Sequence, residues 1–364
     1  YIENGDITVK ASGTEGKNKV SQGNNPEVED TDTIITNQKT DTASSHTVTI
    51  DAGNDKVEVT LKDVNIKADS GSALASKGDV TLTLKGDNHL TGGISDTGNY
   101  GRNGIASTGS LTITGGENGS LTAQGGSGAD GGHGGHGIYS NGSLTISGGS
   151  TVTANGGNGG NVSGDGISSN GSVTISGSTV NATGGDGSGR SGDGGSGITS
   201  NGGVTVSGGT VNAKGGSGKN GNGGDGILSF NPVAISGGTV KSNGGSGTIS
   251  GGDGIRSLDH VAISGGTVKS NGGSGNLSGG NGIISNDIDL SGSLELTAKA
   301  GSPNGKALLQ AGHELDLDTI KDKLGPGAKV TVTDADGKVN QVSIPRPVEP
   351  EEPVIPEESS SSSD

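Results

Sequence analysis

The stretch "GDGISSNGSVTISGSTVNATGG", residues 164–185, decides the fold of this chain. It opens with a glycine and an isoleucine, turns at Asn170-Gly171, and continues through two short segments, "VTIS" and "TVNA", in which apolar and polar residues alternate. Alternation with a period of two, carried by β-branched residues, is typical of β-strands. The stretch therefore predicts three short strands separated by turns and followed by a glycine-rich loop.

Near copies of this unit run down the chain. Its small-plus-aliphatic step recurs at spacings of 31, 33, 29, 31, 29, 28, 28 and 25 residues. The steps are Ala73-Leu74, Gly104-Ile105, Gly137-Ile138, Gly166-Ile167, Gly197-Ile198, Gly226-Ile227, Gly254-Ile255, Gly282-Ile283 and Ala307-Leu308. About five apolar residues per unit make a core only where thin, similar coils stack on one another. The sequence predicts an all-β, right-handed parallel β-helix with three-strand coils of about 28–31 residues, capped at both ends.

The alternation also predicts which side chains face the interior. In the second strand of each coil these are Leu144/Ile146, Val173/Ile175, Val204/Val206, Val233/Ile235 and Val261/Ile263. In the third strand they are Val152, Val180, Val211, Val240 and Val268, with Ala154, Ala182 and Ala213. The threonines, serines and asparagines between them are expected on the outside, stacked in ladders from coil to coil.

Composition excludes several classes of protein. The 364 residues include 78 glycines, which disfavour a helical solenoid, and glycine does not recur at every third position as collagen requires. Between Ile105 and Ile283 eight acids face six bases, so most of the net charge of −16 lies towards the termini. Without a basic stripe or base-stacking aromatics, we expect no nucleic-acid binding. No apolar run approaches the ~18 residues that span a bilayer, so we expect no membrane insertion.

The two ends differ from the repeats. Residues 1–70 are expected to form irregular first coils and a cap, with strands at "HTVTI" (46–50) and "VEVTLKDVNI" (57–66), and residues 71–309 the glycine-rich β-helix. Residues 310–344 are expected to form the C-terminal cap, with a helix-like spacing over 315–325 and a hairpin turned at Asp336-Gly337. The Pro/Glu/Ser-rich residues 345–364 predict a disordered linker. We therefore expect a processed fragment, monomeric and tethered to further modules or to a cell wall.

The stretch "VEVTLKDVNIKADSGSALASKGDVTLTLKGDNHLTGG" (57–93), together with "GSLTITGGENGSLTAQGG" (109–126), resembles the bacterial carbohydrate-binding domain family of right-handed β-helices. The resemblance covers roughly 57–310. It implies a fold of the pectate-lyase type, an extracellular location, secreted or at the cell surface, and binding of calcium and of acidic plant polysaccharide or cellulose. The long run of near-identical coils departs from the family pattern, and no individual binding residue carries over.

Oxygen-bearing residues recur two positions before the aliphatic anchors, at the end of each glycine-rich loop. Stacking would bring them into a column: Asn103, His136, Asp165, Ser196, Asp225, Asp253 and Asn281. Carboxylates and amide oxygens one strand spacing apart are ligands for calcium, which makes Asp165, Asp225, Asp253 and Asn281 the candidate metal ligands. The alternative is that these side chains bond the loop backbone, as in Asx turns.

Basic residues provide a second candidate site. Lys241 and Lys269 occupy equivalent positions in adjacent coils and should stack, and Arg256 lies in a neighbouring coil. These three are candidate ligand-binding residues for an anionic sugar, or else solvated cations. The same two lysines interrupt the threonine ladder and so disfavour an ice-binding face.

Three functions remain open. The first is a non-catalytic polysaccharide-binding β-helix, secreted or at the cell surface, assisted by calcium, with a plant cell-wall or host glycan as its partner. The second is a surface adhesin or stalk in which the repeats are a structural spacer. The third is a polysaccharide lyase-like enzyme. Because no cluster of three carboxylates emerges at one height of the rod, we expect no enzymatic activity.

Overall fold

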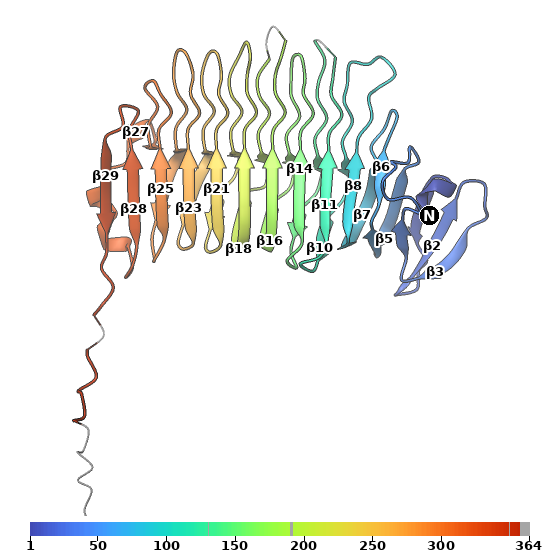
Figure 1. The fold of residues 1–364 in the computed structure, drawn as a ribbon, viewed down its shortest axis with the longest axis horizontal. Helices are drawn as coiled ribbons and strands as arrows, with labels where there is room; N and C mark the ends of the chain where they lie inside the picture. The colour runs from blue at the N-terminus through green and yellow to red at the C-terminus, as the bar shows by residue number, and fades with distance from the viewer. Residues whose placement is uncertain (130, 190–191, 349, 357–364) are drawn as a thin grey trace, which may run out of the picture.

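The computed structural model of the chain describes residues 1–129, 131–189, 192–348 and 350–356. Strands make up 49% of the structure and helices 3%, and the mostly parallel strands wind into a solenoid of about nine turns. Figure 1 shows the strands side by side along a rod, with the N-terminus at one end and the C-terminal segment leaving the other. The predicted all-β parallel β-helix is confirmed.

Each coil contributes one strand to each of three layers. Layer A follows the small-plus-aliphatic steps and comprises the first parts of β5 (Val48–Lys62) and β7 (Leu74–Lys85), β9 (Ile105–Ser107), β12 (Ile138–Ser140), β15 (Ile167–Ser169), β17 (Ile198–Ser200), β19 (Ile227–Ser229), the first parts of β22 (Ile255–Ile263) and β24 (Ile283–Leu290), and β26 (Leu308–Gln310). Layer B comprises the second parts of β5 and β7, β10 (Leu111–Gly115), β13 (Leu144–Ile146), the first parts of β16 (Val173–Thr183) and β18 (Val204–Lys214), β20 (Val233–Ile235), and the ends of β22 and β24. Layer C comprises β6 (Asn65–Lys67), β8 (Asp87–Thr91), β11 (Ser120–Gln124), β14 (Thr151–Asn155), the second parts of β16 and β18, β21 (Thr239–Asn243), β23 (Thr267–Asn271), β25 (Glu295–Lys299) and β28 (Lys329–Thr333).

Strands of adjacent coils pair in parallel with equivalent residues opposite each other. Ile138 of β12, for example, lies between Ile105 and Ile167. All the inward-facing residues that the alternation predicted are buried, with no more than 1% of their surface exposed. They join one apolar cluster that runs from Ile2 to Val342. A narrow interior shared by all coils therefore replaces the broad core of a globular domain.

The glycine-rich loops stack into a thin crest, which we call the fin. It is built from the described residues of 92–104, 125–137, 156–166, 184–197, 215–226, 244–254 and 272–282, each loop joining layer C to layer A. Figure 1 shows these loops rising side by side above the strands. The fin carries almost no apolar residues, so its backbone must supply the bonding.

Backbone hydrogen bonds run through the fin from loop to loop. Gly135 N–H donates to Gly126 O at 2.8 Å, Gly157 N–H donates to Gly135 O at 2.7 Å, and Gly164 N–H donates to Gly157 O at 2.9 Å. The same zigzag continues to Gly301. Successive loops approach each other so closely that a Cβ built on Gly157 would lie 1.9 Å from Gly126 O of the preceding loop. Glycine is therefore required there by contact with a neighbouring backbone.

The N-terminal cap is formed by η1 (Ile2–Asn4) and four strands. These are β1 (Ile7–Ala11), β2 (Lys17–Gln22), β3 (Val28–Thr31) and β4 (Ile34–Thr36). β1 pairs in parallel with β5, whereas β1–β2 and β2–β3 are antiparallel. The antiparallel strands turn away from the stack and end the parallel pairing, while Ile2 is buried at the end of the core.

The C-terminal cap is formed by β27 (His313–Glu314), two short 3₁₀ turns and an antiparallel hairpin. The turns are η2 (Leu317–Thr319) and η3 (Lys321–Lys323), and β29 (Val339–Ser343) pairs with β28. The predicted hairpin is confirmed, and Gly337 adopts φ +87° at its turn. The helix-like spacing over 315–325 gives 3₁₀ turns instead of an α-helix, with the Asp316 side chain accepting the Asp318 N–H at 3.0 Å.

The remaining chain adds nothing to the core. Residues 345–348 and 350–356 have no secondary structure, and nearly all of them are exposed. Residue 349 and residues 357–364 of the predicted linker lie outside the described residues. Within the described ranges, no helix has the length and hydropathy needed to cross a membrane.

Candidate functional site: a groove beside the fin

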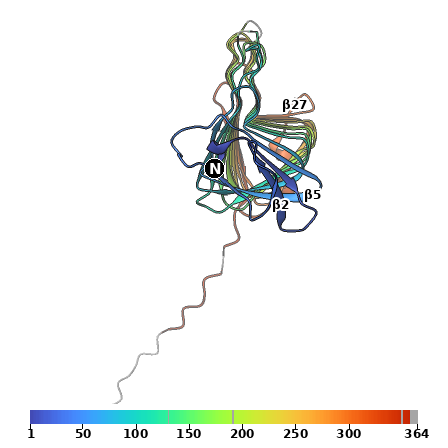
Figure 2. The same cartoon turned by 90° about the vertical axis from the view of Figure 1, so that its right-hand side faces the viewer.

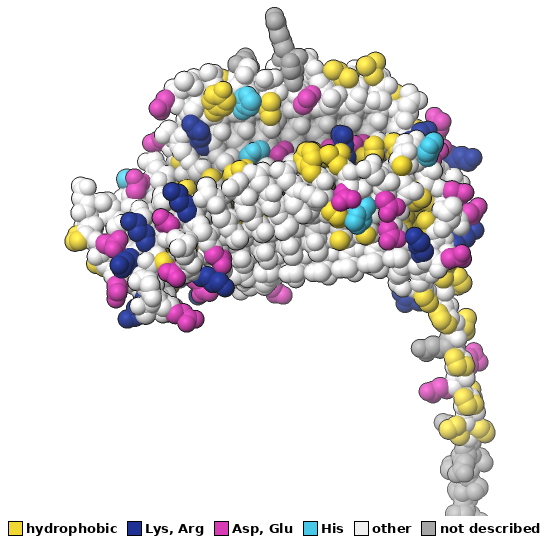
Figure 3. Space-filling model, turned by 180° about the vertical axis from the view of Figure 1, so that it is seen from behind, with side chains coloured by type: hydrophobic (Ala, Val, Ile, Leu, Met, Phe, Trp, Pro, Cys, Tyr) yellow, Lys and Arg dark blue, Asp and Glu magenta, His cyan; other side chains and the backbone are white. Residues whose placement is uncertain are grey.

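The candidate site is the groove between the fin and layer A, which we call the fin groove. Figure 2, which looks along the rod, shows layer A leaving the foot of the fin sideways, towards the label of β27, whereas layer C continues below the fin. Figure 3 shows the resulting hollow from behind, running along the rod below the crest. Its fin wall is the column His136, Asp165, Ser196, Asp225, Asp253 and Asn281, and its floor is the outward column Tyr139, Ser168, Thr199, Leu228, Arg256 and Ile284.

The fin wall is a ladder of side chain-to-backbone hydrogen bonds. Asp165 Oδ1 accepts the Ser196 N–H at 2.8 Å. Asp225 Oδ1 accepts the Asp253 N–H, and Asp253 Oδ1 accepts the Asn281 N–H, each at 2.7 Å. The residues predicted to form a column thus do so, and every side chain of the column except that of Ser196 accepts a backbone N–H of the next coil.

These contacts bear on the two roles predicted for the column. The backbone bonding expected of Asx residues is present, and it occupies one oxygen of each of the three aspartates. The Asn281 amide oxygen accepts the Lys306 N–H at 2.9 Å, and its amide nitrogen donates to Asp253 Oδ1 at 3.0 Å. Among the described residues, no three His, Cys, Asp or Glu side chains gather as a metal-binding group. Calcium binding stays a prediction, to which Asp225 and Asp253 would each bring their second oxygen.

The carboxyl groups of this column are held in an environment that disfavours charge. Burial raises the pKa of Asp225 to about 7; the Asp253 carboxylate adds to the rise, and the Asp253 N–H and the Arg256 charge oppose it. Burial also raises the pKa of Asp253, against the hydrogen bonds from Asn281 and the charge of Arg256. Burial raises the pKa of Asp165, with His136 opposing. The three carboxyl groups are therefore easier to protonate than exposed aspartates, and Asp225 titrates near neutral pH.

The predicted basic site is divided between two faces. Lys241 and Lys269 are in register on β21 and β23, as predicted, and both point into solvent from layer C. Arg256 lies on β22 in layer A, between Leu228 and Ile284, where its charge acts on Asp225 and Asp253. The spacing of the repeats fixes which coil a residue belongs to. It fixes the face only once the residue is assigned to a strand, so the spacing alone did not separate Arg256 from the two lysines.

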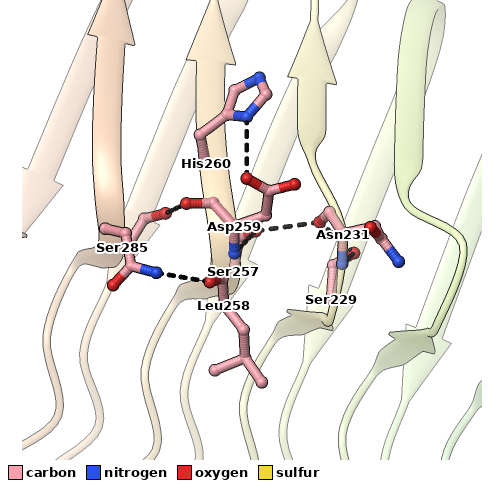
Figure 4. Close-up of polar contacts among 8 residues, drawn as sticks. Ser229, Asn231, Ser257, Leu258, Asp259, His260 and Ser285 are labelled. Carbon is pink, nitrogen blue, oxygen red and sulfur yellow. Dashed lines mark hydrogen bonds and ion pairs between the residues drawn. The ribbon is translucent and has the colours of Figure 1, made fainter.

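A serine ladder fixes the corner between layers A and B. Ser257 Oγ donates to Asn231 O of the preceding coil at 2.9 Å, and Ser285 Oγ donates to Asp259 O at 3.1 Å. Figure 4 shows these contacts and the Asp259–His260 pair, whose Oδ1 and Nδ1 atoms are 3.4 Å apart. Leu258 points away from this network. The corner is thus held by side chains that bond main-chain carbonyls of neighbouring coils.

Exposed apolar residues interrupt the corner in two coils only. Asn141, Asn170 and Asn201 stack there in the earlier coils, with side-chain bonds of 2.8 Å and 3.2 Å between neighbours. Phe230 and Leu258 replace them in the next two coils and are 46% and 43% exposed. Phe230 and Leu258 therefore interrupt the asparagine ladder with exposed apolar side chains.

Two tyrosines at the other end of the fin groove, Tyr100 and Tyr139, were not singled out from the sequence as site residues. His136 and Tyr139 stack with ring centroids 6.0 Å apart, and Tyr100 and His133 lie 5.2 Å apart. The signal was available, since Tyr100 and Tyr139 are two of only three tyrosines; Tyr139 lies three residues after His136, and Tyr100 lies four residues before the Gly104-Ile105 step. The spacing of 33 residues between Ile105 and Ile138 also places Tyr100 opposite His133, whereas His136 and Tyr139 lie three residues apart in one coil.

The layer C side of the fin is shallower and more uniform. A cavity of about 550 Å³ there is lined by glycines and polar residues, among them Asn158, Asp186, Lys214 and Ser217. The outward residues above and below it bond one another, as where Asn212 Nδ2 donates to Asn181 Oδ1 at 2.8 Å. The fin wall on this side has the same kind of bonding, since Asn158 Oδ1 accepts the Asp186 N–H and Asp186 Oδ1 accepts the Ser217 N–H, each at 2.9 Å.

Comparison of the chain with protein-family models, with curated proteins and with solved structures gave no match in any of the three.

Proposed function

We propose that the chain is a non-catalytic polysaccharide-binding β-helix that works outside the cell, and that a linear polysaccharide lies along its fin groove. The observation that carries the proposal is the groove itself: a hollow parallel to the rod axis with acceptor side chains repeated at each coil, about 4.8 Å apart. A repeating ligand suits a repeating wall, because each coil adds one weak polar contact. The family resemblance at residues 57–126 agrees with this role.

The charges of the groove favour a neutral polysaccharide. Three aspartates stand on the fin wall, opposed by Arg256 alone on the floor. An acidic glycan would meet carboxylates at close range unless a cation lay between them. For acidic plant polysaccharides we therefore propose calcium as the bridge, held by Asp225 and Asp253.

A glycan microarray, run with calcium and with a chelator, tests the proposal. We expect binding of neutral plant cell-wall or host-type glycans in both conditions, and binding of polygalacturonate only with calcium. Loss of all glycan binding in both conditions would contradict the proposal and favour a structural spacer.

Two matched variants locate the binding. Thr199→Arg puts a long side chain on the groove floor, where Arg256 already stands two coils further on. Asn212→Arg places the same charge on layer C, in register with Lys241. We expect Thr199→Arg to weaken binding at least tenfold and Asn212→Arg to leave it unchanged. The reverse result would move the site to the layer C cavity.

A lyase-like activity is the second candidate, favoured by one observation: Arg256 acts electrostatically on both Asp225 and Asp253. A lyase needs a base beside a calcium-bound uronate, which this juxtaposition would supply. Release of unsaturated uronate from polygalacturonate, followed by absorbance and absent in Arg256→Gln, would establish it. We expect no such release.

A further inference from the structure

We propose that the N-terminal end of the fin groove is a stacking site for a pyranose ring of a neutral saccharide, formed by Tyr100, His133, His136 and Tyr139. The inference rests on the proposed function and adds to it the residues that would recognise a sugar ring. Elsewhere in the groove the wall and floor are mostly hydroxyls, carboxylates and aliphatic side chains, which cannot stack on a ring.

The four rings come from two adjacent coils and lie on the same side of the fin. Tyr100 is bridged to His133, and Tyr139 pairs with Ala106 of the preceding coil. His133 and His136 are three residues apart on one limb, which places them at most ~10 Å apart along the chain. Figure 3 shows histidine side chains one above the other, on the fin and at its foot, on the face that contains the groove.

The rings of His136 and Tyr139 are held by hydrogen bonds before any ligand arrives. His136 and Tyr139 are nearly parallel, at 20°, and Tyr100 and His133 are inclined at 35°. His136 Nδ1 accepts the Asp165 N–H at 2.9 Å, and the Tyr139 oxygen accepts a bond from Asn170 Nδ2 at 2.9 Å. Rings fixed in this way lose little freedom on binding, which favours stacking.

The same bonds determine what the site offers around the rings. Because His136 Nδ1 is an acceptor, the neutral imidazole carries its proton on Nε2 and can donate it to a hydroxyl. The Tyr139 oxygen accepts from Asn170, so its own proton is not used in that bond. Asp165 lies beside them, with its Oδ2 3.7 Å from His136 Nδ1, and supplies an acceptor.

An apolar face with donors and an acceptor at its edge matches a sugar ring, whose C–H face is apolar and whose rim carries hydroxyls. Where Asp165 is ionised, its carboxylate would repel an anionic sugar, which argues for a neutral one. Tyr100 is 50% exposed, so one ring is open to a ligand from solvent. The geometry points to this end of the groove as the place where a polysaccharide chain is anchored.

The variants that test this follow the repeat. Tyr139→Ser installs the residue found at the same register in the next coil, Ser168, and Tyr100→Val installs the equivalent of Val162 two coils on. Tyr1→Ser, in the N-terminal cap and 56% exposed, is the matched control. Because coils with Ser or Val at these registers already stack, circular dichroism and the unfolding midpoint should stay as in the wild type.

The experiment titrates the full chain with hexasaccharides of β-1,4-glucose, β-1,4-xylose and α-1,4-glucose, with hexagalacturonate as the anionic arm. Tyrosine fluorescence and calorimetry are recorded together; the chain has no tryptophan, so the emission reports its three tyrosines. We expect at least one neutral hexasaccharide to change the emission, also in Tyr1→Ser. Tyr139→Ser and Tyr100→Val should each weaken its binding roughly three- to tenfold.

The outcomes separate this inference from the proposed function. Calorimetric binding with unchanged tyrosine emission, and with wild-type affinity in Tyr139→Ser and Tyr100→Val, would overturn the stacking site and leave polysaccharide binding standing. Preference for hexagalacturonate without calcium would also overturn it. Absence of binding to all four ligands and to the array would end both proposals.

Discussion

Asp225 shows how a single residue in a repeat couples folding to pH. Its carboxyl accepts the Asp253 N–H at 2.7 Å in a half-buried position, where burial raises its pKa from 3.8 to about 7. Between about pH 4 and pH 7 the folded chain therefore holds a proton at this site that the unfolded chain has lost. Stability from this group is present at low pH and falls as the pH rises through that window.

Asp225→Asn should remove that loss. The amide oxygen can accept the same N–H, as those of Asn103 and Asn281 do in the same column. We expect the free energy of unfolding to rise at pH 8 by roughly 2–4 kcal/mol, since each pKa unit is about 1.4 kcal/mol, and to change little at about pH 3, where the carboxyl group is protonated in both states. Urea unfolding at the two pH values measures this. Asp259→Asn, at an exposed position, is the control, and an equal effect of both variants would contradict the prediction.

Asn88 is a polar residue inside the apolar interior. It is fully buried at the position where the next coil has Leu121. Its Oδ1 accepts the Val64 N–H at 2.9 Å, and its Nδ2 donates to the Leu61 and Ser120 carbonyls at 3.2 Å and 3.1 Å. It thereby satisfies main-chain groups where the regular stacking of layer C begins.

Asn88→Ala would leave those buried groups without partners. We expect a loss of about 3 kcal/mol in the free energy of unfolding, because a buried unsatisfied group costs about 1–3 kcal/mol. Asn118→Ala, at an exposed loop position, should change the free energy of unfolding by no more than about 0.5 kcal/mol. Both are measured by chemical denaturation, and a mild effect of Asn88→Ala would indicate that water replaces the amide.

At the scale of elements, the fin is held by hydrogen bonds, most of them between main-chain groups, with a ladder of aspartate and asparagine side chains along its wall. Its limbs pass hydrogen bonds from glycine to glycine across successive coils, and the close approach excludes a Cβ at Gly157. The strands have the opposite character, since their stability comes from buried aliphatic side chains. The fin groove lies where the fin meets the strands of layer A. The position of its wall depends on the spacing of the stacked loops, and its floor depends on the register of the strands.

Gly157→Ala should therefore destabilise the fin. The added methyl group would lie 1.9 Å from Gly126 O, and moving the backbone to relieve this contact should cost at least about 2 kcal/mol. Gly116→Ala is the control, because nothing lies within 4 Å of a Cβ at that position. Thermal unfolding compares the two variants, and similar midpoints would mean that neighbouring loops of the fin separate easily.

For the whole molecule, the caps decide whether the rod remains single. The parallel ladder would otherwise end in a strand with unpaired main-chain groups, here β25, which the hairpin of β28 and β29 covers. Open ends of this kind pair with other chains. The antiparallel pairing of β29 with β28 ends the parallel stack.

Truncation after Pro326 should expose the β25 edge together with buried Leu296 and Ala298. We expect dimers and larger species in light scattering coupled to size exclusion. Truncation after Ile344 keeps the hairpin and should behave as the full chain does. A monomeric shorter form would show that the turns η2 and η3 suffice as a cap.

Much of this molecule was predictable from its sequence. The alternation at Leu144/Ile146 and its repeats fixed the inward-facing residues, because in a strand the period of two leaves only one assignment that buries the aliphatic set. The recurring anchor steps predicted the column from Asp165 to Asn281, because parallel coils bring equivalent residues together. The hairpin at Asp336-Gly337 followed from local turn preference.

Only the tertiary structure decided which faces meet. It placed Arg256 beside the carboxylates and away from Lys241 and Lys269, and it brought Tyr100 to His133 and His136 to Tyr139. It also set the fin sideways to layer A, which makes the groove. The physical reason is that periodicity fixes inside against outside one coil at a time. The direction in which a loop leaves its coil is set by hydrogen bonds between coils, which no single repeat contains.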